Sequence, residues 1–194
     1  MMKKPLPEVV TSDTRSTFYS TAHIEDKNTV SIPLSNGDLW PSAWADDDFL
    51  YVANGDGKGL NTSMPWQDIV TGRVRGTPWD NSLSGINLAS GDDVAKVWSD
   101  PDRYNRKPTG MVCVDGVLYL AVQDLCKAKF GIFDEAPAAS IYKSTDKGRT
   151  WTGTDEPMFS DYVFTTVMFL DYGKNSENCP DDYVYAYGMD YNWR

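Results

Sequence analysis

The fold is decided by the stretch Ser144-Thr145-Asp146-Lys147-Gly148-Arg149-Thr150-Trp151, which follows the pattern S-x-D-x-G-x-T-W. An Asp in such a turn accepts hydrogen bonds from nearby backbone amides, and a Gly two residues later takes the positive φ that a Cβ disfavours. Thr150 and Trp151 favour a returning strand, with the indole packing under the turn. The stretch therefore predicts a tight strand-turn-strand in which Asp146 has a structural role.

A strand pattern recurs around this turn. Its three copies are Leu50-Tyr51-Val52-Ala53-x-x-Asp56, Leu118-Tyr119-Leu120-Ala121-x-x-Asp124 and Val184-Tyr185-Ala186-Tyr187-x-x-Asp190, and each follows an acidic turn. We interpret Ile141–Trp151 and Ile86–Trp98 as a second repeated hairpin, interleaved with the first. Four antiparallel strands in each repeated unit are typical of β-propeller blades.

We therefore predict an all-β fold, a β-propeller of four-stranded antiparallel blades, with an extended arm at 1–35 and a partial propeller at 36–194. The arm contains short β-like pieces such as Thr29–Ile32, and it is expected to contribute one strand. The blades are expected at about 37–98, 107–152 and 159–194, the last incomplete. Because propellers usually close with four to eight blades, about two and a half to three and a half blades indicate a fragment or an unusually short propeller. Open sheet edges then favour self-association. A β-sandwich with chance similarity is the alternative.

The charge of the chain restricts its partners. The formal net charge is −10, so a nucleic acid or an anionic membrane would repel it. No apolar run is long enough to span a bilayer. The N-terminus, Met1-Met2-Lys3-Lys4-Pro5, is basic but lacks the apolar segment of a signal peptide, so no signal peptide is visible.

The three cysteines and the single histidine do not form a zinc-binding pattern. Cys113 lies in an apolar run and is expected to be a buried thiol. Pairing of Cys126 with Cys179 in an oxidising compartment remains open.

Topology predicts which residues share a face. In a four-stranded blade, the loop that enters the first strand and the loop that leaves the second strand lie on the same face, opposite the hairpin turns. The candidate catalytic residues on this face are Asp38, Asp56 and Asp124. The candidate substrate-binding residues are Trp40, Trp44, Arg103, Arg106 and Asp190. For each Asp, the alternative is a local cap on a following turn.

We expect no cofactor and no metal. Calcium is left as an alternative, since hard cations prefer several oxygen ligands, but no spaced calcium-binding loop is present. Its ligands would be Asp56, Asp124 and Asp190.

The segments Gly37-Asp38-Leu39-Trp40-Pro41-Ser42-x-Trp44 and Phe164–Lys174 resemble a sialidase-like propeller family of unassigned function. The Ser144–Trp151 stretch resembles the Asp-box of such propellers, a structural corner built here from Ser144, Asp146, Gly148, Thr150 and Trp151. The resemblance implies a propeller, an exported protein and a glycan-related role. Sialidases proper share an Arg-Ile-Pro motif. Here the comparable piece is Ser31-Ile32-Pro33, so sialidase activity is not supported.

The sequence is compatible with three candidate functions. The first is a glycoside hydrolase-like enzyme acting on an unknown glycan, since glycosidases use two carboxyl groups and Asp38 and Asp56 form the preferred pair. The second is a non-catalytic glycan-binding propeller, in which Trp40, Trp44 and Trp66 stack on sugar rings. The third is a scaffold or truncated remnant without activity of its own.

Overall fold

The computed structural model describes residues 18–21, 23–24, 35–131, 133 and 135–191 of the 194-residue chain. The chain separates into two units, Met1–Val30 and Ser31–Arg194, and the described strands belong to the second unit. The strand expected within Thr29–Ile32 lies outside the described residues, as does Ser31-Ile32-Pro33. In the described part of the chain, no helix is long and apolar enough to cross a membrane.

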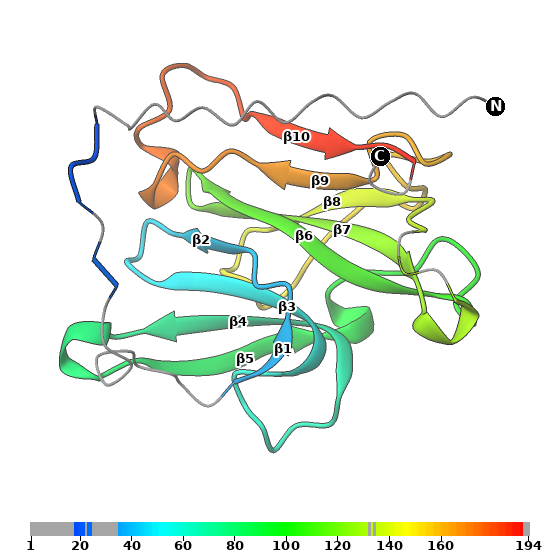
Figure 1. Cartoon of the computed structure of the whole chain (residues 1–194), viewed down its shortest axis with the longest axis horizontal. Helices are drawn as coiled ribbons and strands as arrows, with labels where there is room; N and C mark the ends of the chain where they lie inside the picture. The colour runs from blue at the N-terminus through cyan, green and yellow to red at the C-terminus, as the bar shows by residue number, and fades with distance from the viewer. Residues whose placement is uncertain (1–17, 22, 25–34, 132, 134, 192–194) are drawn as a thin grey trace. The chain divides into compact units, whose positions relative to one another are not determined.

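The described strands form three antiparallel sheets, which confirms the predicted all-β class (Figure 1). The first sheet contains β1 (Asn36–Asp38), β2 (Ser42–Trp44), β3 (Leu50–Gly59), β4 (Gln67–Arg75) and β5 (Ser84–Ser90). From β2 to β5 each strand pairs with the next, which is the meander of a propeller blade. β1 pairs with the far half of β3, where Asp38 lies opposite Gly55.

β3 is longer than the sequence predicted. We expected the strand to end at Ala53 and Asn54–Gly57 to form a loop. The strand continues to Gly59 because β1 pairs with one edge of this segment and β4 with the other. Gly57 permits the close approach of β1, since a Cβ there would lie 2.3 Å from the carbonyl oxygen of Asn36.

The second sheet contains β6 (Tyr104–Val114), β7 (Val117–Cys126) and β8 (Ala139–Ser144), paired in that order. The strand predicted at Thr150–Trp151 does not form. A single bridge between Lys143 and Thr152 takes its place. The physical reason is that the Thr150 amide donates to the Asp146 carboxylate at 2.9 Å, so it does not join a strand ladder.

The interpretation of Ile86–Trp98 as a hairpin equivalent to Ile141–Trp151 is wrong. Ile86 to Ser90 lie in β5, the last strand of the first sheet, and Gly91–Asp93 forms a short 3₁₀ turn after it. The connection equivalent to the Asp146 turn is the one between β4 and β5, which contains the 3₁₀ turn Pro78–Asp80. The error arose because β4, with its mixed sequence QDIVTGRVR, was not recognised as a strand.

The third sheet contains β9 (Thr166–Phe169) and β10 (Ala186–Met189), with Thr166 opposite Met189. The strand predicted from the pattern that starts at Val184 is present as β10, although it begins two residues later. Within the described residues, β10 pairs with β9 alone. Two further 3₁₀ turns lie in connections, at Ala128–Phe130 and at Lys174–Ser176.

The hydrophobic core lies between the first and second sheets. Trp98 and Trp151 pack against it from its edge, and the rings of Trp98 and Tyr142 are 5.8 Å apart. The largest buried members of the core are Tyr51, Ile69, Val94, Met111, Leu118, Leu120, Val122 and Tyr142. These residues come from β3, β4, β6, β7, β8 and the segment after β5, so burial of apolar surface holds the two sheets face to face.

The turn after β8 is held by Asp146, as the sequence predicts. Its carboxylate accepts hydrogen bonds from the Ser144 hydroxyl at 2.8 Å, and from the amide and the hydroxyl of Thr150 at 2.9 and 2.7 Å. Gly148 has a φ of 79°, and its amide donates to the Ser144 hydroxyl. Trp151 packs against the core. Asp146 therefore organises the turn and lies away from the cleft described below.

The three cysteines are free thiols, and Cys113 and Cys126 are buried. The buried thiol predicted for Cys113 is confirmed. The alternative pairing of Cys126 with Cys179 does not occur in this structure.

Candidate functional site

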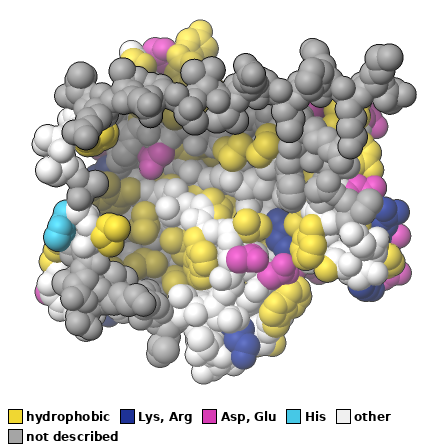
Figure 2. All heavy atoms as spheres, in the orientation of Figure 1, with side chains coloured by type: hydrophobic (Ala, Val, Ile, Leu, Met, Phe, Trp, Pro, Cys, Tyr) yellow, Lys and Arg dark blue, Asp and Glu magenta, His cyan; other side chains and the backbone are white. Residues whose placement is uncertain are grey.

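A cleft of about 540 Å³ lies where strands of all three sheets meet. Its polar lining consists of Asp38, Asp56, Lys107, Thr109, Gln123 and Thr166. Its apolar lining consists of Leu39, Trp40, Pro41, Pro108, Leu125, Phe133, Met168 and Met189. Figure 2 shows acidic side chains beside hydrophobic ones over β1 and β3. The cleft thus combines a large apolar surface with a few ionisable groups, as ligand sites commonly do.

Asp56 and Lys107 form an ion pair in this cleft. Asp56 has a φ of 43° within β3, a conformation that is uncommon for a residue with a side chain. Its Oδ1 lies 2.7 Å from Nζ of Lys107. Lys107 extends from β6 and its side chain is 1% exposed, whereas that of Asp56 is 31% exposed. The Lys107 ammonium also donates to the carbonyl oxygen of Asp68 at 3.1 Å, so the buried charge is paired and hydrogen-bonded.

Asp38 lies beside this pair on β1. Gly55 makes room for both neighbours, because a Cβ there would lie 3.1 Å from Oδ1 of Asp38 and 2.9 Å from Cδ of Lys107. Partial burial raises the pKa of Asp38, and the negative charge of Asp56 raises it further. The charge of Lys107 opposes this rise without cancelling it. Asp38 therefore holds a proton more readily than an ordinary aspartate does.

The two carboxyl groups of the cleft consequently have different environments. Asp56 contacts a buried ammonium directly, whereas Asp38 has a raised pKa and forms no ion pair within the described part of the chain. A carboxyl group whose pKa is raised by its surroundings can serve as a proton donor closer to neutral pH.

Two tryptophans lie near the charged groups. The indole of Trp40 is fixed by a hydrogen bond of 3.2 Å from its Nε1 to the carbonyl oxygen of Gly37, and 37% of the residue is exposed in the cleft. Trp66 lies outside the cleft lining, with its ring centroid 5.9 Å from the Lys107 ammonium. Trp40 thus offers a fixed aromatic surface beside Asp38 and Asp56.

The structure places Asp124 away from the cleft. It is fully buried in β7, and its Oδ2 accepts hydrogen bonds from the amides of Trp98 at 3.0 Å and Ser99 at 2.7 Å. Burial raises the pKa of Asp124. Its bonds tie β7 to the connection between the first and second sheets, which is a structural role.

The two predicted arginines also lie outside the cleft lining. Arg106 binds the carboxylates of Asp68 at 2.8 Å and Asp92 at 2.6 Å, and so holds β6 to the first sheet. Arg103 binds Glu135 at 2.5 Å. Both guanidinium groups are engaged by acidic residues of the protein itself.

The remaining predicted residues are distributed elsewhere. The ring of Trp44 lies 5.9 Å from the Lys174 ammonium, and Oδ1 of Asp190 accepts a hydrogen bond from the amide of Phe164 at 2.6 Å. The described residues contain no cluster of three or more His, Cys, Asp or Glu that is arranged to hold a metal ion, so Asp56, Asp124 and Asp190 are not gathered together.

Sequence reasoning did not find the wall of the cleft formed by Leu125, Phe133, Met168 and Met189. These residues are far apart in the sequence and lie in one cleft because β6 and β7 pack against the third sheet. Buried hydrogen bonds fix that packing. The Thr109 hydroxyl donates to the carbonyl oxygen of Val167 at 2.7 Å, and the Thr166 hydroxyl donates to Oε1 of Gln123 at 2.6 Å. Lys107 was not among the predicted site residues.

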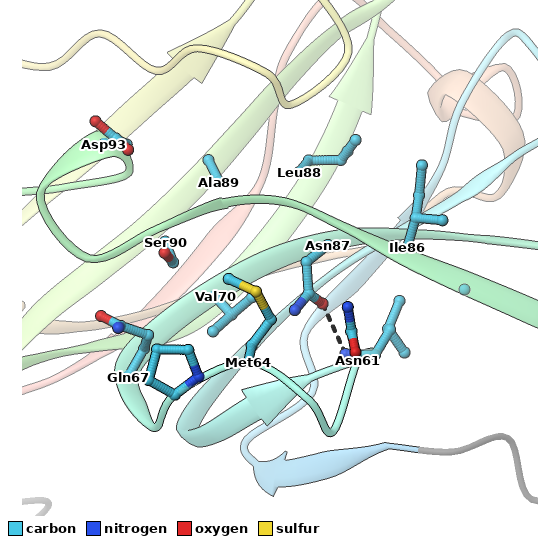
Figure 3. A pocket seen from close by; sticks show the side chains of 13 residues that line it. Asn61, Met64, Gln67, Val70, Ile86, Asn87, Leu88, Ala89, Ser90 and Asp93 are labelled. Carbon is cyan, nitrogen blue, oxygen red and sulfur yellow. Dashed lines mark hydrogen bonds between the residues drawn. The ribbon is translucent and has the colours of Figure 1, made fainter.

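A second concavity, of about 370 Å³, lies on the first sheet beneath the loop that follows β3 (Figure 3). Asn87 joins this loop to β5, accepting a hydrogen bond from the Leu60 amide at 2.7 Å and donating one to the carbonyl oxygen of Lys58 at 2.8 Å. Met64 and Ile86 line it, and Asp93 is its one ionisable residue. It lacks the paired carboxyl groups of the cleft.

No protein-family model matches this chain, and no curated protein matches it. Among solved structures, the chain is similar to one described as Hadza microbial sialidase Hz136, with a TM-score of 0.41 and 21% sequence identity. The match covers 67% of this chain and 25% of that chain, so it spans about a quarter of the length of that protein.

Proposed function

We propose that the cleft binds a glycan and that the protein acts on it as a glycoside hydrolase-like enzyme, with Asp38 as the proton donor and Asp56 as the carboxylate. The observation that supports this proposal is the presence of two carboxyl groups in one cleft with different electrostatic surroundings. Glycosidases use such a pair, one acid with a raised pKa and one charged partner.

In this scheme Trp40 stacks on the apolar face of a sugar ring and positions it over the two carboxyl groups. The glycosidic C–O bond breaks, and the leaving oxygen takes the proton of Asp38. Asp56 either removes a proton from the water that adds to the sugar carbon, or attacks that carbon before water replaces it. The configuration of the released sugar distinguishes the two routes.

The test uses Asp38→Asn and Asp56→Asn, with Asp102→Asn as the matched control, since Asp102 is exposed and lies outside the cleft. Release of reducing sugar is measured on a panel of plant, fungal and animal glycans. Loss of the proton donor lowers turnover by about 10²- to 10⁴-fold. Thermal melting checks that each variant folds. Full turnover in both cleft variants would contradict the assignment of Asp38 and Asp56 as the catalytic pair.

The second candidate is a non-catalytic glycan-binding protein. The ion pair between Asp56 and Lys107 favours it, because a carboxylate held by a buried ammonium is well suited to accept hydrogen bonds from sugar hydroxyls. This function predicts saturable binding to a glycan array with no product formed. The Asp56→Asn variant then binds more weakly than the Asp102→Asn control. Export of the protein and self-association through open sheet edges remain predictions.

A further inference from the structure

The cleft has two chemically different sides. On the side of β1, β3 and β6 lie Asp38, Asp56 and the ring of Trp40. On the side of β7, β9 and β10 lie Leu125, Met168 and Met189, joined by Phe133. Met168 and Met189 are each 37% exposed and Phe133 is 55% exposed, so large apolar side chains face the opening of the cleft. We call these four residues the apolar wall.

The hydroxyl groups beside the apolar wall are directed to the protein. Thr109 donates to the carbonyl oxygen of Val167 at 2.7 Å, and Thr166 donates to Oε1 of Gln123 at 2.6 Å. A sugar hydroxyl placed against this wall would lose its hydrogen bonds to water and would gain no hydrogen bond to the protein in exchange. Its burial there is therefore unfavourable. Methionine thioethers instead make good contacts with aromatic rings and adapt to irregular apolar groups.

We infer that the ligand of the cleft is a glycoside with an apolar aglycone, aryl or alkyl, which lies on the apolar wall while the sugar lies at Asp38, Asp56 and Trp40. This inference rests on the proposed function of the same cleft. An unsubstituted polysaccharide fits the arrangement less well, because it carries hydroxyl groups on both sides of every glycosidic bond.

The experiment compares phenyl and methyl glycosides of the same sugars, namely glucose, galactose, mannose, xylose, fucose and N-acetylglucosamine, by calorimetric titration of the full chain. Burying one aromatic ring on the apolar wall makes the phenyl glycoside bind about 10- to 100-fold more tightly for at least one sugar. Free phenol is titrated separately, and it binds far more weakly because it lacks the sugar.

Met168→Ser removes part of the wall and lowers the phenyl preference at least about fivefold, with the methyl glycoside unaffected. Met158→Ser is the matched control. Met158 is 51% exposed and lines a separate groove with Tyr119 and Ile141, so its replacement leaves the preference unchanged. Met189→Ser provides a second wall variant if Met168→Ser does not fold.

The outcomes separate the two proposals. Equal binding of phenyl and methyl glycosides would overturn the apolar-aglycone inference and leave the glycan function standing. No binding of either glycoside would overturn the proposed function as well. If free phenol binds as tightly as the phenyl glycoside, the cleft recognises apolar rings without sugar, which contradicts both.

Discussion

Asp146 shows how much structure one carboxylate can fix. Burial alone would raise its pKa, but the hydrogen bonds from the amide and hydroxyl of Thr150, and from the Ser144 hydroxyl, outweigh burial and lower it. The pKa falls because these bonds are stronger to the charged form. The turn is therefore more stable while Asp146 is ionised.

Replacing Asp146 with Ala is expected to lower the free energy of unfolding by about 1–3 kcal/mol at pH 7, since charge-assisted bonds to Thr150 and Ser144 are lost. The pKa of Asp146 is lower in the folded chain than in the unfolded chain, where it is about 3.9. Its contribution is therefore present above that value and is lost as the pH falls through the folded-state pKa. Urea unfolding at pH 7 and at a pH below about 3.9 measures the difference from wild type, which should shrink only at the lower pH. A difference that is constant with pH would contradict this account.

The role of a residue could be predicted from the sequence where its contacts are local, and not where they are distant. Asp146 acts on neighbours within four residues, and its role was predicted from the pattern of the turn. Asp38 and Asp56 were predicted to share a face from the order of the strands, and they line one cleft. Asp124 receives bonds from Trp98 and Ser99, at least 25 residues away, and no local pattern indicates that contact.

At the scale of the secondary-structure element, the pairing of β1 with β3 positions the cleft. β1 carries Asp38, and the bonds on both edges of β3 hold Asp56 next to it. The glycine at position 57 is required because Asn36 and Gly37 of β1 pass within 2.4 Å of where a Cβ would stand. β1 has three residues, so its place depends on this contact.

Gly57→Ala is therefore expected to displace β1, lower the free energy of unfolding by about 2 kcal/mol or more, and weaken ligand binding in the cleft. Gly131→Ala is the control. There a Cβ meets no atom of the described residues within 4 Å, and the cost of about 1 kcal/mol comes from the positive φ. Urea unfolding and titration of the cleft ligand measure both effects. If Gly57→Ala binds ligand as well as Gly131→Ala does, β1 does not position the site.

The elements themselves were partly predictable. The recurring strand pattern of the sequence indicated β3, β7 and β10, and the structure has a strand at each place. The extension of β3 to Gly59 was missed, since glycine is unfavourable in strands and its close contact with β1 is a tertiary feature. β4 was not recognised as a strand because its sequence contains many polar residues. Ile86–Trp98 was therefore equated with the wrong hairpin.

At the scale of the whole molecule, the sheets are joined by partly buried hydrogen bonds as well as by the core. Asp124 fixes the connection that leads from the first sheet to the second, and Thr109 links β6 to the third sheet through the carbonyl oxygen of Val167. The cleft depends on this arrangement because its lining comes from all three sheets.

Asp124→Ala is expected to destabilise the molecule by about 2–4 kcal/mol, because the amides of Trp98 and Ser99 lose their acceptor and a buried side chain is removed. Asp124→Asn is milder, since its amide oxygen still accepts from Trp98 and Ser99. Urea unfolding gives the order of stability. Ligand titration, carried out where each variant is folded, should show unchanged affinity. If a fully stable Asp124→Asn variant instead lost binding or turnover, Asp124 would have a direct role in the functional site.

The architecture of sheets was predictable because the repeat of strands and turns is a local signal that recurs. The complete lining of the cleft was not, since the apolar wall depends on how the third sheet packs against β6 and β7. No sequence pattern around Phe133, Met168 and Met189 distinguishes them from ordinary core residues.

The burial of Lys107 has a practical consequence for chemical labelling. Its ammonium is enclosed by Asp56 and the carbonyl oxygen of Asp68, and its side chain is 1% exposed. Amine-reactive reagents will modify exposed lysines such as Lys143 first. The protein can therefore be coupled to a sensor chip or a resin through its lysines while the ion pair of the cleft stays intact.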